Sequence, residues 1–150
     1  MKITTPLIAC VLLFASAVQA DNGLVNLASQ FSVQETADRF VAAVEKAGLK
    51  VFSRIDHAAG AEKVGQSLRP TQLIIFGSPK VGTALMTSDQ RAGIDLPMKA
   101  LAWQDAEGKV WLSYNSPDYM FERFAIDDRQ PVKKKITGAL SKFSQKATQP

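Results

Sequence analysis

Two reactive residue types are almost missing from this sequence. Its 150 residues contain one cysteine, Cys10, and one histidine, His57. Because Cys10 lies in an N-terminal segment that we expect to be removed, the remaining chain cannot form a disulfide, use a thiol nucleophile or bind a metal through thiolates. One histidine, without a thiol or a serine in a nucleophile motif, gives little support to hydrolase chemistry. We therefore expect a domain that is stabilised by packing alone.

Repeats, long linkers and low-complexity blocks are also absent, and the net charge is only +4. Much of the positive charge lies near the C-terminus, at Lys133–Lys135, Lys142 and Lys146. A nucleic-acid surface would place basic residues among exposed aromatic residues, and this pattern is missing there. We interpret the lysines as the solvated face of a helix and expect no nucleic-acid partner.

The first twenty residues have the pattern of a secretory signal peptide. Lys2 supplies the positive start, "PLIACVLLFASA" the apolar core, and Val18 and Ala20 the small residues before a cleavage site. The apolar run is too short to span a bilayer comfortably, so we expect no membrane span. We expect cleavage after Ala20 and one α/β domain over residues 21–150. Export to the periplasm is favoured because disulfides are absent.

The clearest helix of the sequence covers about residues 32–48. Ser32 and Glu35 form a capping box, and Gly48 supplies the C-terminal stop. Strands predicted at 23–32 and 49–55 flank this helix, and their β-α-β order favours a parallel pair if they are neighbours. One apolar face of the helix is formed by residues at helical spacing, Ala37, Phe40, Val41 and Val44. One side of the second strand is expected to carry Leu49, Val51 and Ile55.

Later segments predict the rest of one sheet. The continuous apolar run in "TQLIIFG" predicts a central strand at 71–77 that is covered on both faces, or at least well buried. Ser-Pro pairs at 78–79 and 116–117 are typical helix starts. A β-hairpin with Gly108 in its turn is predicted next, and an amphipathic helix closes the sequence. We expect an α/β (α+β) two-layer sandwich, with one mixed β-sheet of about five strands and helices packed mainly on one face.

Several short motifs occur in a characteristic order. They are the histidine before small residues in "DHAAG", then "LRPT", "FGSPKVGT", "DLP" with a following lysine, and "YNSP". By these motifs the segment from about Phe31 to Phe124 resembles the domain of unknown function 302 family, although Ser78 stands where asparagine is common. The resemblance implies a compact α/β fold with a mixed sheet, and members that tend to form homodimers. It implies no reaction, and a fold alone does not fix a function.

His57 is the first candidate for chemistry. If Asp56 caps a short helix, His57 lies in its first turn, where the positive helix end favours a neutral imidazole. A neutral imidazole can act as a ligand or as a base. It can equally bond a backbone carbonyl and only hold the turn.

The "FGSPKVGT" turn is the second candidate. A strand that ends at Gly77 and a helix entered at Ser78 present free N–H groups to an anion, and Lys80 adds positive charge. The spacing to Gly82 is superficially similar to a phosphate loop, but Thr83 stands where the lysine is needed. The segment is either a tight turn or a site for a small anion or carboxylate.

A third group of polar residues lies at predicted strand ends or beside prolines. Arg69 precedes Pro70, which biases it to extended geometry and fixes the direction of its guanidinium. Asp95 could bind a ligand, or it could have only a structural role as a cap or as the partner of Arg69 or Lys99. A cleft lined by His57, Arg69 and Asn115 would suit a small polar or anionic ligand. The group comprises Arg69, Thr71, Asp95, Lys99, Tyr114 and Asn115.

The leading hypothesis is an exported, homodimeric module that binds a small polar or anionic ligand. One alternative is a small enzyme with His57 as general base and Asp95 or Tyr114 as its partner. A second is a metal or haem protein, in which His57 acts as the haem ligand or binds Cu(I) together with a methionine. A third is a purely structural dimer. We assign no metal ligand and no cofactor; the methionines considered for copper are Met86, Met98 and Met120.

Overall fold

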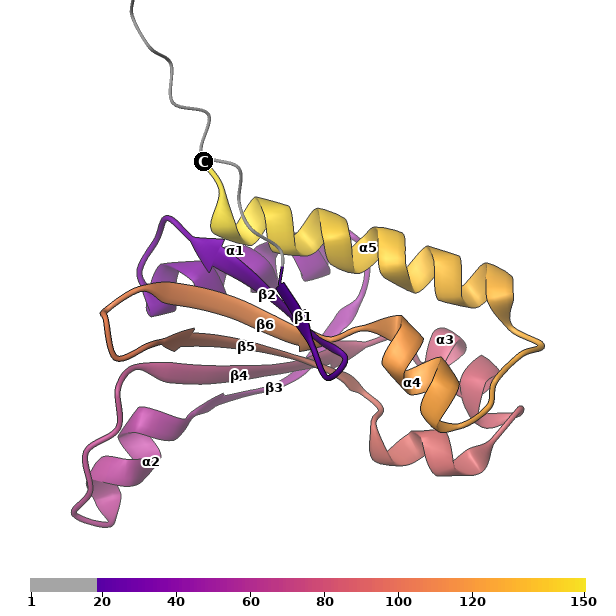
Figure 1. Ribbon diagram of the computed structural model, residues 1–150, viewed down its shortest axis with the longest axis horizontal. Helices are drawn as coiled ribbons and strands as arrows, with labels where there is room; N and C mark the ends of the chain where they lie inside the picture. Colours follow the sequence, from indigo (N-terminus) through magenta and orange to yellow (C-terminus); the bar gives the residue numbers. More distant parts are fainter. Residues whose placement is uncertain (1–18) are drawn as a thin grey trace, which may run out of the picture.

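Six strands form one sheet in the computed structural model, which describes residues 19–150 (Figure 1). They are β1 (Gln19–Asp21), β2 (Leu24–Ser29), β3 (Lys50–Asp56), β4 (Thr71–Gly77), β5 (Met98–Gln104) and β6 (Val110–Asn115). Residues 1–18 of the predicted signal peptide lie outside the described residues. Its last two residues, Gln19 and Ala20, belong to β1.

The strand order is β1-β2-β6-β5-β4-β3, and every neighbouring pair is antiparallel. The predicted mixed sheet is therefore corrected to an antiparallel one. The physical reason is the crossover: β2 and β3 flank a helix in sequence but are separated by three strands in the sheet, so they cannot form a parallel pair.

Helices cover one face of this sheet, which confirms the predicted two-layer α+β class. The long helices α1 (Val33–Lys46) and α5 (Gln130–Thr148) lie side by side over the strands. α2 (His57–Lys63) stands at one end of the sheet, while α3 (Pro79–Met86), the 3-10 helix η1 (Gln90–Ile94) and α4 (Pro117–Arg123) gather at the other end (Figure 1). No helix among residues 19–150 has the length and apolar character needed to cross a membrane.

Local capping signals place most of these helices. The Ser32 hydroxyl accepts a hydrogen bond from the backbone N–H of Glu35 at 3.2 Å, which confirms the predicted start of α1. Asp56 caps α2 in the same way, and Ser116 caps α4. Ser78 occupies the corresponding position before α3, but its side chain makes no capping bond. The start of α3 therefore depends on its Pro-led first turn rather than on a serine cap.

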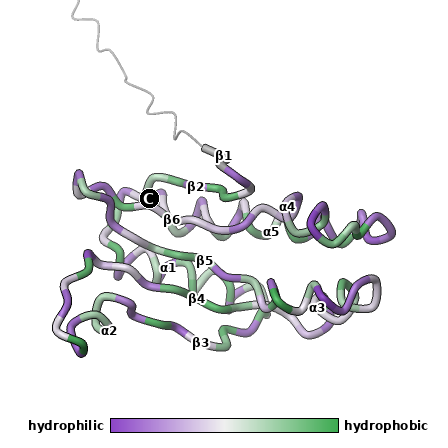
Figure 2. Tube along the Cα trace, turned by 60° about the horizontal axis from the view of Figure 1, so that its bottom comes forward, coloured by the Kyte–Doolittle hydropathy of each residue, from purple (hydrophilic) through white to green (hydrophobic). Residues whose placement is uncertain are grey.

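Strand β4 shows which side of the sheet is covered. Gln72, Ile74 and Phe76 are buried on the helix side, whereas Leu73 and Ile75 alternate onto the other side and are only half-buried. The strand is therefore not covered on both faces, whereas the other predicted alternative, that it is well buried, holds for its helix side. Figure 2 views the open side, with α1 and α5 behind the strands. An antiparallel sheet can leave one face uncovered because its hairpin connections need no helices there.

A β-bulge changes the alternation of β3. Val51 pairs with Phe76, but the next pair joins Ser53 to Ile75, so Phe52 is an extra residue. The two pairs place Val51 on the helix side and Ser53 on the open side. Ile55 follows Ser53 onto the open side, although the sequence predicted that it would share a side with Val51. The bulge shifts the alternation by one residue and frees Phe52 from the regular ladder.

Candidate functional site

The sheet register separates the residues that the sequence suggested as one cleft. Asp56 pairs with Gln72 at one end of β3 and β4, and Lys50 pairs with Gly77 at the other end. Seven extended residues span about 20 Å. His57, Arg69 and Thr71 therefore lie at one end, and the Gly77 turn, Asp95, Lys99 and Asn115 lie at the opposite end. The expected cleft of His57, Arg69 and Asn115 is not formed.

His57 is exposed at the start of α2, and its side chain makes no hydrogen bond or ion pair within the described chain. Arg69 donates from Nε to the backbone carbonyl of Gln104 at 3.1 Å, and Thr71 donates its hydroxyl to the carbonyl of Arg69 at 2.9 Å. These bonds fix the entry to β4 beside the end of β5. Arg69 and Thr71 therefore have structural partners, while the structure brings no carboxylate or hydroxyl to His57.

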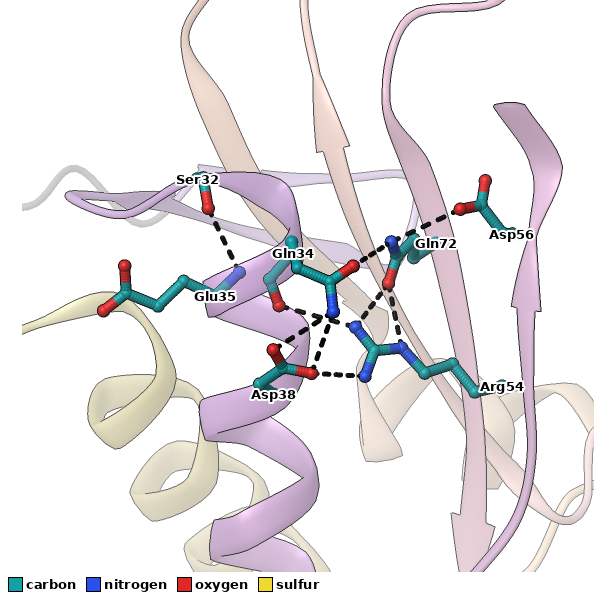
Figure 3. A network of polar contacts seen from close by, with 7 residues as sticks. All are labelled: Ser32, Gln34, Glu35, Asp38, Arg54, Asp56 and Gln72. Carbon is teal, nitrogen blue, oxygen red and sulfur yellow. Dashed lines mark hydrogen bonds and ion pairs between the residues drawn. The ribbon is translucent and has the colours of Figure 1, made fainter. Parts of the chain in front are cut away.

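A polar network that the sequence did not suggest closes this end of the sheet (Figure 3). Buried Gln72 accepts from Nε of Arg54 at 2.8 Å and donates to Oε1 of Gln34 at 2.8 Å. Arg54 also forms an ion pair with Asp38 on α1, which holds the pKa of that carboxyl below its usual value of 3.8. The signal in the sequence was a single glutamine at a helix-facing position of an otherwise apolar strand.

The polar groups of this network bond mainly to one another. Gln34 contributes its carbonyl to Arg54 at 3.4 Å and its amide nitrogen to the two oxygens of Asp38 at 3.2 and 3.1 Å. Across the described part of the chain, no buried side-chain nitrogen or oxygen lacks a hydrogen-bond partner. Buried polar groups destabilise a fold only when they are unpaired. A structural role, joining α1 to β3 and β4, is therefore enough to explain these residues.

The opposite end of the sheet contains a cavity of about 780 Å³. Its floor is the bulged start of β3 and the end of β4, where Phe52 and Phe76 lie. One wall is α3 with the turn at residues 93–98, and the facing wall is α5. Gly77, Ser78, Gly82 and Thr83 line it, so the structure places four residues of the predicted "FGSPKVGT" site at one cavity. Lys80 lies in α3 but does not line it.

The chemistry of the lining is mostly apolar. Leucine, phenylalanine, valine, methionine and proline side chains supply most of the surface, and no aspartate or glutamate contributes to it. The charged side chains that line the cavity are Lys134, Lys135 and Lys142, all exposed on α5. Within residues 19–150 none of the three lysines has a carboxylate partner. The cavity is therefore mainly apolar, with three exposed lysines along its α5 side.

Two glycines explain why the protein's own side chains do not fill this space. Gly48 adopts φ +74°, so α1 ends before it can cover the last residues of β4. In α5, Gly138 lines the cavity, and a Cβ atom added there would meet nothing within 4 Å. The helix therefore presents a gap between Lys135 and Lys142 where another residue would project a side chain.

Polar contacts hold the wall opposite α5. Arg129, just before α5, donates from Nε to the carbonyl of Ala84 in α3 at 3.0 Å. Asp95 pairs with Arg123 at 3.2 Å, not with Arg69 or Lys99 as the sequence suggested. Lys99 instead donates to the carbonyls of Asp95 and Pro97 at 3.2 and 3.1 Å. The "DLP" motif and its lysine therefore shape the turn that carries Pro97 into the cavity.

The remaining sequence candidates lie apart from the cavity. Asn115 borders a second space of only about 20 Å³, together with Asp95 and Lys99. Tyr114 is buried beneath the helices, and burial raises the pKa of its hydroxyl above 10.0, partly offset by a hydrogen bond with Ser144. Tyr114 faces the helix layer, so it is not a partner for exposed His57.

The residues proposed to bind copper also lie far apart. Met86 and Met98 line the large cavity and Met120 borders the small one, whereas His57 lies at the other end of the sheet. The described residues contain no cluster of three or more histidine, cysteine, aspartate or glutamate side chains that could hold a metal ion. No His57–methionine site is therefore formed.

The chain was compared with known proteins. It is 44% identical over 128 residues to a protein named fluoride-specific ion channel FluC 1 from Brucella suis biovar 1 (strain 1330), and matches one of the same name from Brucella abortus biovar 1 (strain 9-941) equally well. The alignments cover 83% of this chain and 50% and 47% of those proteins, so the chain spans about half the length of the curated relatives it matches.

A solved structure supports the fold. The crystal structure of an uncharacterized conserved protein, DUF302, from Bacillus stearothermophilus has a TM-score of 0.74 and 13% sequence identity. The match covers 83% of this chain and 98% of that one. The family model described as "Domain of unknown function DUF302" matches residues 25–143, which confirms the resemblance seen from Phe31 to Phe124. The chain therefore belongs to the DUF302 family.

Proposed function

We propose that this protein is a binding module for an amphipathic anion, a molecule with an apolar body and a carboxylate or similar head. One observation carries the proposal: the apolar cavity of about 780 Å³ is lined on its α5 side by three exposed lysines that have no carboxylate partner in the described chain. Pockets for small molecules typically measure about 300–1,000 Å³. The polar ligand expected from the sequence is replaced by a mainly apolar one, because the cavity walls are apolar.

The two parts of the ligand would contribute differently. Burial of its apolar body against the walls supplies most of the affinity, at roughly 25 cal/mol per Å² removed from water. The lysines act at the exposed opening, where salt screens them, so they contribute mainly selectivity for a negative head. Their flexible side chains can lay methylene groups along the apolar body while the ammonium groups stay in water.

The proposal is tested by calorimetric titration with dodecanoate and with dodecyltrimethylammonium, which share an apolar chain and differ in charge. We expect dodecanoate to bind and the cation to bind at least about tenfold more weakly, because each exposed charge pair contributes little but all three lysines act together. Native mass spectra of the same samples should show one dodecanoate per chain. Equal binding of the two probes, or no binding of dodecanoate, would contradict the proposal.

Two glycine variants provide matched proteins for this titration. Gly138→Leu places a side chain into the cavity, and Gly60→Leu makes the same change in α2, far from it; an added Cβ meets nothing within 4 Å at either position. Gly138→Leu should remain folded and lose dodecanoate binding, whereas Gly60→Leu should bind like the unchanged protein. Loss of binding in both variants would point to a general effect on the fold.

Fluoride is a second ligand hypothesis, which the names of the Brucella relatives suggest for this chain. Those proteins are about twice the length matched here, so channel activity would concern a longer protein. The three lysines at the cavity opening could hold a small anion. Titration with sodium fluoride against sodium chloride, at matched ionic strength, should show heat specific to fluoride if this hypothesis is correct.

We also propose that the protein is exported to the periplasm and acts as a homodimer. The signal-like N-terminal segment supports the first point. The uncovered face of the sheet supports the second, because Trp103 and Trp111 stack there with ring centroids 6.4 Å apart on neighbouring strands. A second copy could cover these rings. Native mass spectra test the oligomeric state, and a monomer at all concentrations would contradict it.

A further inference from the structure

Exposed apolar side chains flank the lysines at the cavity opening. Phe52, freed by the bulge in β3, lines the cavity and is 42% exposed. Ile94 does not itself line the cavity, but it directly follows Gly93, which does, and it is 71% exposed. Exposed apolar side chains close to exposed lysines are the combination that peripheral membrane surfaces use. We call Phe52, Ile94, Lys134, Lys135 and Lys142 the cavity rim.

No carboxylate within residues 19–150 forms an ion pair with a lysine of the cavity rim. Four carboxylates on nearby elements are already paired with arginine or lysine. The three rim lysines are left without a carboxylate partner inside the described chain, and none of the lining residues is acidic. The pairs are Asp89–Arg91, Asp95–Arg123, Asp118–Lys133 and Asp128–Arg129.

We propose that the cavity rim docks on an anionic lipid bilayer, from which an amphipathic anion enters the cavity. The docking rests on the rim itself, and the identity of the entering molecule rests on the proposed function. Lysines attract anionic headgroups within a Debye length, and apolar side chains such as Phe52 and Ile94 insert at the boundary between headgroups and acyl chains. A molecule with a long apolar body partitions into bilayers, so docking brings the opening to its source.

Vesicle cosedimentation of the full chain tests the docking. Vesicles of phosphatidylcholine mixed with phosphatidylglycerol should bind the protein, and vesicles of phosphatidylcholine alone should bind it much more weakly. Replacing Lys134, Lys135 and Lys142 together by glutamine should weaken binding to the anionic vesicles about 100-fold, since each lysine near such a surface contributes roughly fivefold. Added salt should reduce the same binding.

A matched variant removes the same charge elsewhere. Lys63, Arg69 and Lys109 do not line the cavity and lie at the other end of the sheet. Their triple replacement by glutamine should therefore change binding by less than about threefold. Both triple variants keep the same apolar N-terminal segment, so their difference reports the rim alone. Equal losses in the two variants, or no preference of the unchanged protein for anionic vesicles, would overturn the proposal.

The apolar contribution has its own pair of variants. Ile94→Ser should weaken binding to anionic vesicles, and Val64→Ser should not, although Val64 is 72% exposed at the other end of the sheet. Gly138→Leu separates the two proposals, because it fills the cavity and leaves the rim intact. Vesicle binding without dodecanoate binding in the unchanged protein would sink only the ligand proposal. Dodecanoate binding without a preference for anionic vesicles would sink only the docking.

Discussion

The two ends of β4 face the same helix layer, but one end is filled by a hydrogen-bond network and the other borders a cavity. At one end, buried Gln72 is joined to Arg54 and Gln34 by hydrogen bonds under the first turns of α1. At the other end, Phe76 faces a cavity, because α1 has already stopped at Lys46. The comparison shows that a sheet face needs complete hydrogen bonding wherever it buries polar groups. Apolar surface can instead stay open for a ligand.

The open end is kept at some cost in stability. Apolar surface left in contact with water forgoes roughly 25 cal/mol per Å² of stabilisation. A ligand that fills the cavity would recover part of this free energy and would bind only the folded chain, so it should raise the unfolding temperature. The network end offers no such gain in stability on ligand binding, because its polar groups already have their partners.

Phe40→Ala should have the largest effect, because this residue of α1 stands between the two ends. Its ring packs edge-on against Phe76 at 5.1 Å and Phe143 at 6.2 Å, and it is fully buried. Truncation should lower the free energy of unfolding by about 3–5 kcal/mol, measured by urea denaturation. A loss below about 1 kcal/mol would mean that the neighbouring cavity collapses around the smaller side chain.

Gln72→Leu should have a smaller effect, confined to the network end. The change leaves Nε of Arg54 and Oε1 of Gln34 without their partner, so unfolding should become easier by about 1–3 kcal/mol. Exposed Gln66, in the loop after α2, is a matched control, and Gln66→Leu should shift stability by less than about 0.5 kcal/mol. Dodecanoate binding should survive in both variants, and its loss in Gln72→Leu would show that the two ends are coupled.

Asp38→Asn should have the smallest effect and should change a pH slope. The ion pair with Arg54 holds the pKa of Asp38 below 3.8 in the folded chain. Its stabilisation is therefore complete above the unfolded value and is lost as pH falls through 3.8 towards the lower folded value. The variant should lose stability less steeply on acidification, in urea melts at several pH values. Asp89 and Asp105, with pKa values that are also lowered, keep part of the slope. Identical slopes would contradict the prediction.

Much of the local structure could be predicted from the sequence. Ser32, Asp56 and Ser116 each cap the helix that the sequence assigned to them, and Gly108, with φ +83°, makes the predicted hairpin turn. Such signals act between residues a few positions apart, so they can be read from neighbouring letters. Part of the candidate site was also local: the "FGSPKVGT" turn lies at the cavity because a strand end and a helix start meet there.

The sequence by itself determined the helices, most strands, the two-layer class and the family. Tertiary structure alone decided which strands are neighbours, and thus that the sheet is antiparallel and that His57 and Asn115 lie at opposite ends. It also decided that Arg54 meets Asp38 across the helix–sheet interface, and that α5 faces α3 across an apolar cavity. The physical reason is range: caps and turns depend on adjacent residues, whereas register and cavities depend on packing between segments far apart in the chain.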